Sequence, residues 1–136
     1  MKTTLLLAIV ISAGAAFANA QCVRDGLEVY GIVKGQVVED RANGEPIRGS
    51  SVSVSEDKYE GKLIASTTTD EHGNFTLPRV KLGKYSIAFR YPNFDPIITR
   101  LRVLRSKSNQ SFIKARIAPP DPAGSDSCEG DAEVIR

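Results

Sequence analysis

The single histidine of the chain, His72, lies among side chains that are able to bind a metal ion. Asp70 and Glu71 precede it and Asn74 follows it, and imidazole nitrogens and carboxylate oxygens are common metal ligands. The spacing is unsuitable, because a calcium loop of the EF-hand type needs ligands at alternate positions and a late Glu, whereas an apolar strand follows Asn74. Asp, Gly and Asn also satisfy a tight turn without an ion. We therefore interpret the segment as a turn and predict no metal site.

A catalytic set is hard to assemble from this composition. The sequence contains one His, two Cys and no Trp. Hydrolytic zinc sites use at least three protein ligands, often with several His, and a Ser or Cys nucleophile needs a base such as His72 beside it. Because we expect His72 to lie in an exposed turn, the sequence predicts no enzymatic activity and no cofactor.

Charge is the second chemical signal. The 136 residues carry a net charge of only +2, yet residues 79–116 contain ten basic residues and one acid, whereas residues 119–136 contain five acids and one Arg. Four of the basic residues alternate with apolar residues in two consecutive predicted strands: Arg100, Arg102, Lys114 and Arg116. If these strands form a hairpin about residue 108, all four side chains share one outer face and form a basic stripe.

Two interpretations of this basic stripe remain open. It would bind an acidic protein surface, an anionic glycan or a lipid headgroup, with salt-dependent association. Alternatively, these basic residues only form a solvated sheet face and discourage edge pairing. The acidic tail could also fold back onto them. The near-neutral total charge argues against a nucleic-acid partner.

Exposed aromatic side chains are the usual platforms for sugar rings in β-sandwiches. Trp is absent, and we expect Tyr85 to be buried in a strand. Tyr59 and Tyr91 are the candidate sugar-stacking residues, because an amphipathic ring is suited to a half-exposed position.

The first 20 residues have the pattern of a secretion signal. Lys2 precedes the apolar residues 5–11, and Ala18-Asn19-Ala20 forms an Ala-x-Ala cleavage site. The apolar stretch is shorter than the ~20 residues of a spanning helix, so we expect a cleaved signal peptide and no transmembrane anchor. In an oxidising compartment, Cys22 and Cys128 are expected to form a disulfide.

Apolar residues recur with period two after the signal, as in Val29, Val33 and Val37. This alternation is typical of β-strands, and no window has the 3.6-residue period of a helix. The expected strands are residues 29–39, 50–56, 62–69, 74–78, 84–91, 96–105 and 110–118. Seven short strands separated by turns predict an antiparallel β-sandwich. Residues 119–136 are Pro-rich and acidic and are interpreted as a loose tail.

Five stretches combine turn glycines with alternating apolar residues: residues 35–40, 43–54, 69–77, 82–87 and 93–94. Together they resemble carboxypeptidase regulatory-like domains, also described as transthyretin-like or prealbumin-like sandwiches. The resemblance covers roughly residues 33–104. Ser50, Leu82 and Asn93 depart from the residues usual in that family, without affecting a β-sandwich.

The resemblance implies a seven-stranded Ig-like or prealbumin-like β-sandwich, with a carbohydrate-binding-like fold. Related sandwiches include a ureide-ring hydrolase, which uses several His and a C-terminal Tyr-Arg-Gly-Ser, and ring-cleaving dioxygenases, which hold iron through two Tyr and two His. This chain has one His and closes with residues Glu-Val-Ile-Arg, so neither activity is expected. The matching motifs are turn and core residues, which indicate fold more than function.

These observations predict three segments: a signal peptide (1–20), a β-sandwich domain (21–118) and a Pro-rich acidic tail (119–136). The expected function is that of an exported, non-catalytic module in the periplasm or outside the cell. It would bind an unidentified envelope protein or serve a structural role. The alternative is a carbohydrate-binding module that uses Tyr59, Tyr91 and the basic strand face.

Overall fold

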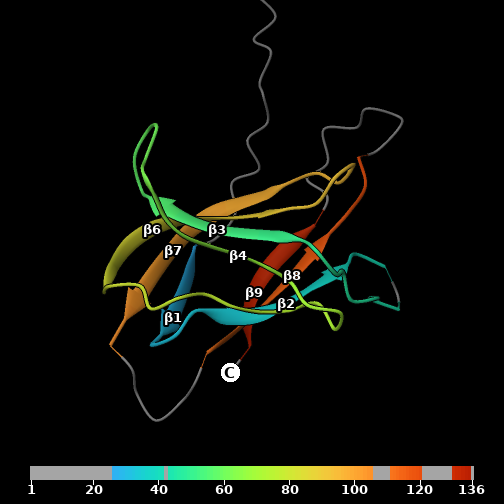
Figure 1. Cartoon of the computed structure of the whole chain (residues 1–136), viewed down its shortest axis with the longest axis horizontal. Helices are drawn as coiled ribbons and strands as arrows, with labels where there is room; N and C mark the ends of the chain where they lie inside the picture. The colour runs from blue at the N-terminus through green and yellow to red at the C-terminus, as the bar shows by residue number, and fades with distance from the viewer. Residues whose placement is uncertain (1–25, 42, 106–110, 121–129, 136) are drawn as a thin grey trace, which may run out of the picture.

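Every element of the described chain is a β-strand, as predicted. The computed structural model describes residues 26–41, 43–105, 111–120 and 130–135, and no helix occurs among them. Two more strands are present than the seven expected. In chain order they are β1 (Leu27–Tyr30), β2 (Lys34–Glu39), β3 (Ser51–Glu56), β4 (Leu63–Thr68), β5 (Asn74–Thr76), β6 (Gly83–Arg90), β7 (Ile97–Leu104), β8 (Phe112–Ile117) and β9 (Asp131–Ile135) (Figure 1).

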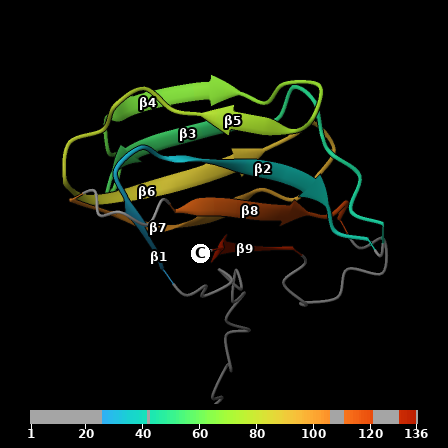
Figure 2. The same cartoon turned by 90° about the horizontal axis from the view of Figure 1, so that it is seen from below.

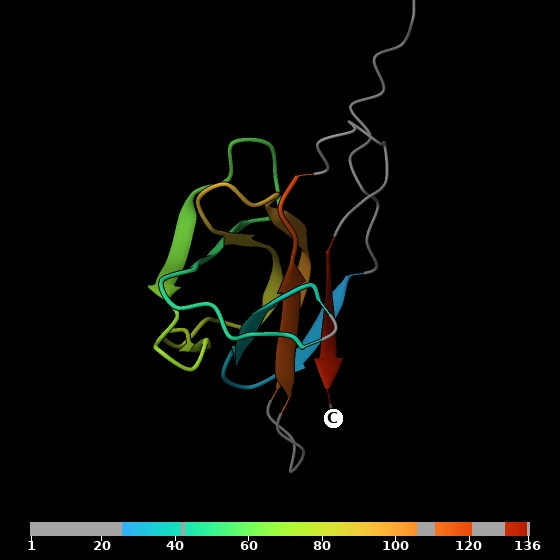
Figure 3. The same cartoon turned by 90° about the vertical axis from the view of Figure 1, so that its right-hand side faces the viewer.

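The strands form two sheets that pack face to face around one core (Figure 2 and Figure 3). The five-stranded sheet has the order β1-β7-β6-β3-β4, and the four-stranded sheet has the order β5-β2-β8-β9. Alternate residues of the strands point inward because successive side chains leave a strand on opposite faces. The fully buried apolar residues include Val37, Val52, Val54, Ile87, Phe89, Ile97, Leu101, Ile113 and Ile117. The predicted β-sandwich is thereby confirmed.

The predicted strand 29–39 is two strands. Gly31 has a φ of 77°, a conformation that glycine adopts at little cost, and it turns the chain from one sheet into the other. β1 then pairs in parallel with β7, and β2 pairs in parallel with β8. The expectation of a purely antiparallel sandwich was therefore wrong, because uninterrupted alternation on both sides of Gly31 concealed the change of sheet.

The predicted hairpin about residue 108 does not form. β7 belongs to the five-stranded sheet and β8 to the four-stranded sheet. β7 has β6 and β1 as its neighbours, and β8 has β2 and β9. Both edges of each strand are thus occupied, so β7 and β8 cannot pair with each other.

The expectation of a tail without strands was also wrong in its last part. Residues Asp131–Ile135 form β9, which pairs antiparallel with β8 (Figure 3). The predicted signal peptide, Cys22 and Cys128 lie outside the described residues, so export and the disulfide stay predictions. No helix of the described segments is long and apolar enough to cross a membrane.

Candidate binding face

The four residues of the predicted basic stripe lie on two different sheets. Arg100 and Arg102 project from β7 on the outer face of the five-stranded sheet, where both are exposed. Lys114 and Arg116 project from β8 on the outer face of the four-stranded sheet, where both are half-buried. Because the outer faces of a sandwich point in opposite directions, the prediction of one shared stripe was wrong.

Arg116 is occupied by contacts within the fold. Its Nη2 lies 2.7 Å from Oε1 of Glu133, and its Nη1 lies 3.1 Å from Oδ1 of Asp131. Because the guanidinium donates hydrogen bonds to Glu133 and to Asp131, the pKa of Arg116 is raised above its ordinary value. Lys114 is directly opposite Glu133 in the β8–β9 register. Acidic residues of the predicted tail thus lie against the basic residues of β8. This agrees with one of the alternatives drawn from the sequence, in which the acidic tail folds back onto the basic residues.

The outer face of β7 is arranged differently. Arg102 is opposite Glu28 of β1 on one side and Lys84 of β6 on the other, so the three residues form a row across the sheet. Arg102 Nη1 and Glu28 Oε1 are 3.5 Å apart, and both side chains are about half exposed. This exposed pair contributes little to stability, but it neutralises Arg102 and leaves Lys84 without an acidic partner among the described residues.

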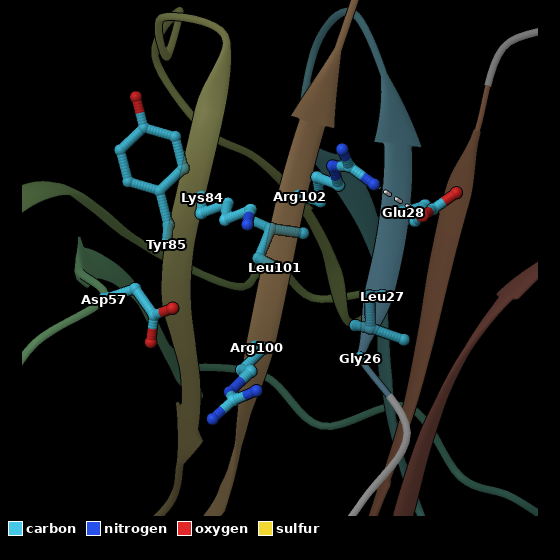
Figure 4. A pocket seen from close by; sticks show the side chains of 9 residues that line it. All are labelled: Gly26, Leu27, Glu28, Asp57, Lys84, Tyr85, Arg100, Leu101 and Arg102. Atoms are coloured by element: carbon cyan, nitrogen blue, oxygen red, sulfur yellow. Dashed lines mark hydrogen bonds and ion pairs between the residues drawn. The ribbon is translucent and has the colours of Figure 1, made fainter.

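A shallow hollow of about 390 Å³ lies beside this row (Figure 4). Its lining comes from β1 and the residue before it, from β6 and β7, and from the turn after β3. The lining residues are Gly26, Leu27, Glu28, Asp57, Lys84, Tyr85, Arg100, Leu101 and Arg102. Figure 4 shows the basic residues on β6 and β7 between Asp57 on one side and Glu28 on the other.

Lys84 and Arg100 are the cations best placed to bind an anion. They are diagonal neighbours on adjacent antiparallel strands, since Lys84 is opposite Arg102, and such neighbours are about 7–8 Å apart. Neither forms a salt bridge within the described part of the chain. A carboxylate bound between them would contact both cations.

Lys84, Glu28 and Asp57 belong to this face but were not predicted from the sequence as binding residues. Lys84 alternates with the inward-facing Tyr85, which is a signal for an outward position. Its position beside Arg100 depends on the β6–β7 register, which alternation alone does not specify.

The two candidate sugar-stacking residues lie at opposite ends of the β3–β6 pair. Tyr59 follows β3 and is 93% exposed. Tyr91 follows β6, where Arg90 is opposite Ser51 at the start of β3. The six residues of β3 separate them, a length of about 20 Å. Tyr91 also packs edge-to-face on Phe94, with ring centroids 5.4 Å apart, so the two tyrosines do not form one platform.

The turn at His72 is built as the sequence predicted. Asp70 Oδ1 accepts hydrogen bonds from the backbone N–H groups of His72 and Asn74, both at 2.9 Å. Gly73 has a φ of 74°, and a Cβ there would meet the backbone oxygen of Val37. His72 is exposed and lies 3.5 Å from the Glu71 carboxylate. Within the described segments no group of three or more His, Cys, Asp or Glu is arranged to hold a metal ion.

The family model for the carboxypeptidase regulatory-like domain matches residues 32–113. The chain belongs to this family. The match begins just before β2 and ends in β8, so the family domain comprises most of both sheets. β1 and β9 are outer strands of this protein that lie beyond the matched residues.

Comparison with individual proteins agrees with this family fold. Structural protein 27 of a virus (isolate Australia/Victoria) is 26% identical over 113 residues, which are 76% of this chain. The match spans only 22% of that viral protein. Klebsiella pneumoniae 5-hydroxyisourate hydrolase is similar in structure, with a TM-score of 0.52 and 16% identity over 74% of this chain and 94% of the hydrolase. (S)-allantoin synthase has a TM-score of 0.50 and 12% identity over 84% of this chain and 46% of the synthase. At these identities, the two structures support a transthyretin-like fold and carry no activity over to this chain.

Proposed function

We propose that this family member is an exported, non-catalytic module of the cell envelope that binds an acidic protein partner. The observation that carries the proposal is the contrast between the two outer faces. Arg116 on the four-stranded sheet is neutralised by Asp131 and Glu133. Lys84 and Arg100 on the five-stranded sheet have no salt bridge among the described residues and line a hollow.

An acidic protein surface is the partner that suits this face best. The hollow is shallow and open, so it offers a small-molecule ligand little burial, whereas a protein would cover the surrounding sheet as well. Charge complementarity on such a surface would mainly raise the association rate and the salt dependence of binding. The expected signal peptide and the Cys22–Cys128 disulfide belong to this proposal, because both imply a periplasmic or extracellular location.

A carbohydrate partner is the second candidate, and Tyr59 is the residue that favours it. Its ring is almost fully exposed in the turn between β3 and β4, so a sugar could stack on it without rearrangement. Tyr91 does not join it, because Tyr91 lies at the other end of the β3–β6 pair and packs on Phe94.

The two candidates separate in a binding experiment with two probes. Poly-glutamate stands for an acidic protein, and a sulfated polysaccharide stands for an anionic glycan. Binding of poly-glutamate that falls with salt and is lost in Lys84→Ala/Arg100→Ala supports the protein-binding proposal. Polysaccharide binding that is lost in Tyr59→Ala, with no poly-glutamate binding, supports the glycan instead.

A further inference from the structure

The exposed apolar side chains are concentrated at one end of the sandwich. In both sheets the odd-numbered strands end and the even-numbered strands begin at this end, which lies on the left in Figure 2. Seven large apolar or aromatic residues of the described chain are exposed, and six of them lie here. We call this region the apolar end, and its six residues are Ile32, Tyr59, Leu63, Ile64, Leu82 and Ile135. The seventh, Ile98, is the second residue of β7 and lies near the opposite end.

The most exposed of these side chains come from three separate connections. Ile32 lies between β1 and β2, Tyr59 between β3 and β4, and Leu82 directly before β6. Their exposed fractions are 56%, 93% and 56%. Single exposed apolar residues are common on any protein, but a group of them at one place marks a contact surface for a protein or a membrane. The apolar end is therefore a candidate contact surface.

The two ends of the sandwich also differ in charge. The described connections at the apolar end contain five basic residues and two acids: Lys58, Lys62, Arg79, Lys81 and Arg105 against Asp57 and Glu60. Those at the opposite end, with His72 neutral, contain two basic residues and five acids: Arg41 and Arg48 against Asp40, Glu45, Asp70, Glu71 and Asp95. Arg79, Lys81 and Arg105 form no salt bridge within the described residues. The domain is thus polarised along its strands, from a basic apolar end to an acidic opposite end.

Lysines are direct neighbours of exposed apolar residues at the apolar end. The three pairs are Lys58–Tyr59, Lys62–Leu63 and Lys81–Leu82. Such pairs suit the surface of an anionic bilayer, because the ammonium groups stay among the headgroups while the apolar neighbours enter the boundary of the acyl chains. Tyrosine is one of the two residue types that are enriched at this depth.

A protein partner would suit the apolar end less well. The cores of protein interfaces are depleted of lysine, whereas here three exposed apolar residues have a lysine beside them. Two copies that met through their apolar ends would bring like charges together, which opposes association. An anionic bilayer attracts all of these cations, and each Lys or Arg near its surface adds to the binding.

We infer that the apolar end docks on a bilayer that contains anionic lipid, with Ile32, Tyr59 and Leu82 inserted among the headgroups. The strands then run away from the bilayer, and the acidic end points away from it. This inference goes beyond the proposed function and does not depend on it, because it uses the end of the sandwich and not the face that carries Lys84 and Arg100.

The absence of Trp from the sequence allows a site-specific test in the full chain. Leu82→Trp and Tyr59→Trp each place a single Trp at the apolar end, and Ile98→Trp is the control because Ile98 is exposed to a similar degree, 47%. On vesicles of phosphatidylcholine and phosphatidylglycerol, Trp emission of the first two variants should shift to shorter wavelength and should be quenched by brominated lipid. The control should not respond. No shift at Leu82 and Tyr59, or an equal shift at Ile98, would overturn the inference.

Co-sedimentation with the same vesicles tests the apolar side chains. Ile32→Ser/Leu82→Ser should weaken binding at least about tenfold, because two apolar side chains no longer leave water. Ile98→Ser should bind like the parent chain. A parent chain that leaves the vesicles unbound but self-associates in sedimentation velocity would assign the apolar end to a second copy and overturn the inference.

The charges are tested in the same assay. Lys81→Gln/Arg105→Gln should weaken binding and reduce its dependence on salt. Arg48→Gln/Arg90→Gln removes the same charge near the opposite end and should not weaken it; equal loss in both variants, or equal binding to phosphatidylcholine alone, would contradict docking through the basic apolar end. All of these variants keep Lys84 and Arg100, so their binding of poly-glutamate should be unchanged. Failure of the docking is thereby distinguished from failure of the proposed function.

Discussion

Thr69→Val removes a hydroxyl group that connects three segments inside the sandwich. Thr69 is 5% exposed, and its Oγ1 accepts a hydrogen bond from the backbone N–H of Ser50 at 2.9 Å. The same hydroxyl donates to the carbonyl of Ile47. Valine has nearly the same shape, so the change removes the two hydrogen bonds without creating a cavity. Ser50 is fully buried, and therefore water cannot replace the lost acceptor.

These two hydrogen bonds determine how much the free energy of unfolding should fall. A buried donor without a partner costs about 1–3 kcal/mol, and losing the second hydrogen bond costs about 1 kcal/mol. Thr69→Val should therefore lower the free energy of unfolding by about 2–4 kcal/mol, a large fraction of the ~5–15 kcal/mol typical of a domain. In urea, with m of about 1–3 kcal/mol/M, the midpoint should fall by at least about 0.7 M without a change in m.

The matched control is Thr76→Val. Thr76 is exposed on β5, so the same substitution there should change the unfolding free energy by less than about 0.5 kcal/mol. Equilibrium urea unfolding, followed by Tyr fluorescence or circular dichroism, measures both variants. Equal stability of the Thr69 variant and the control would refute the assigned role of this hydroxyl.

Three further predictions concern other parts of the fold. Gly35→Ala should prevent folding or cost more than about 3 kcal/mol in urea unfolding, because its Cβ would overlap the backbone oxygen of Ile113 on the neighbouring strand; near-normal stability would contradict the close β2–β8 approach. Arg116→Met should lower stability by no more than about 1 kcal/mol, since its ion pairs are partly exposed, but should speed amide exchange in β9 selectively; uniform exchange rates would contradict the pairing. The pKa of Glu56 lies below its ordinary value because its carboxylate accepts hydrogen bonds from the Lys62 backbone N–H and the Lys58 ammonium. Its contribution to stability should therefore be present above the unfolded pKa and lost as pH falls through the folded pKa. The substitution Lys58→Ala should raise the folded pKa of Glu56, measured by NMR titration; an unchanged value would exclude the contact.

The sequence predicted most elements because alternation is a local property. The expected strand 50–56 corresponds to β3, and the expected strand 84–91 corresponds to β6 within one residue at each end. Alternation also identified Arg100 and Arg102 as outward-facing, and both are exposed. These predictions needed only the rule that successive residues of a strand face opposite sides.

Assignment of strands to sheets was not predictable in the same way. The connection between β7 and β8 crosses from one sheet to the other, and inward residues of both sheets look alike in sequence because they share one core. The change at Gly31 was concealed for the same reason. The pairing of β9 with β8 depends on contacts between residues distant in sequence, among them Arg116 with Glu133, which alternation over a five-residue strand does not reveal.

The measurement that tests the proposed binding face most directly is affinity capture from a cell-envelope extract at low and moderate salt. Lys84→Ala/Arg100→Ala is compared with Arg48→Ala/Arg79→Ala, which removes the same charge from two exposed positions elsewhere. We predict an acidic partner that the parent chain and the control capture at low salt and that the Lys84/Arg100 variant loses. Equal capture by both variants would contradict it, because binding would then follow total charge or another surface.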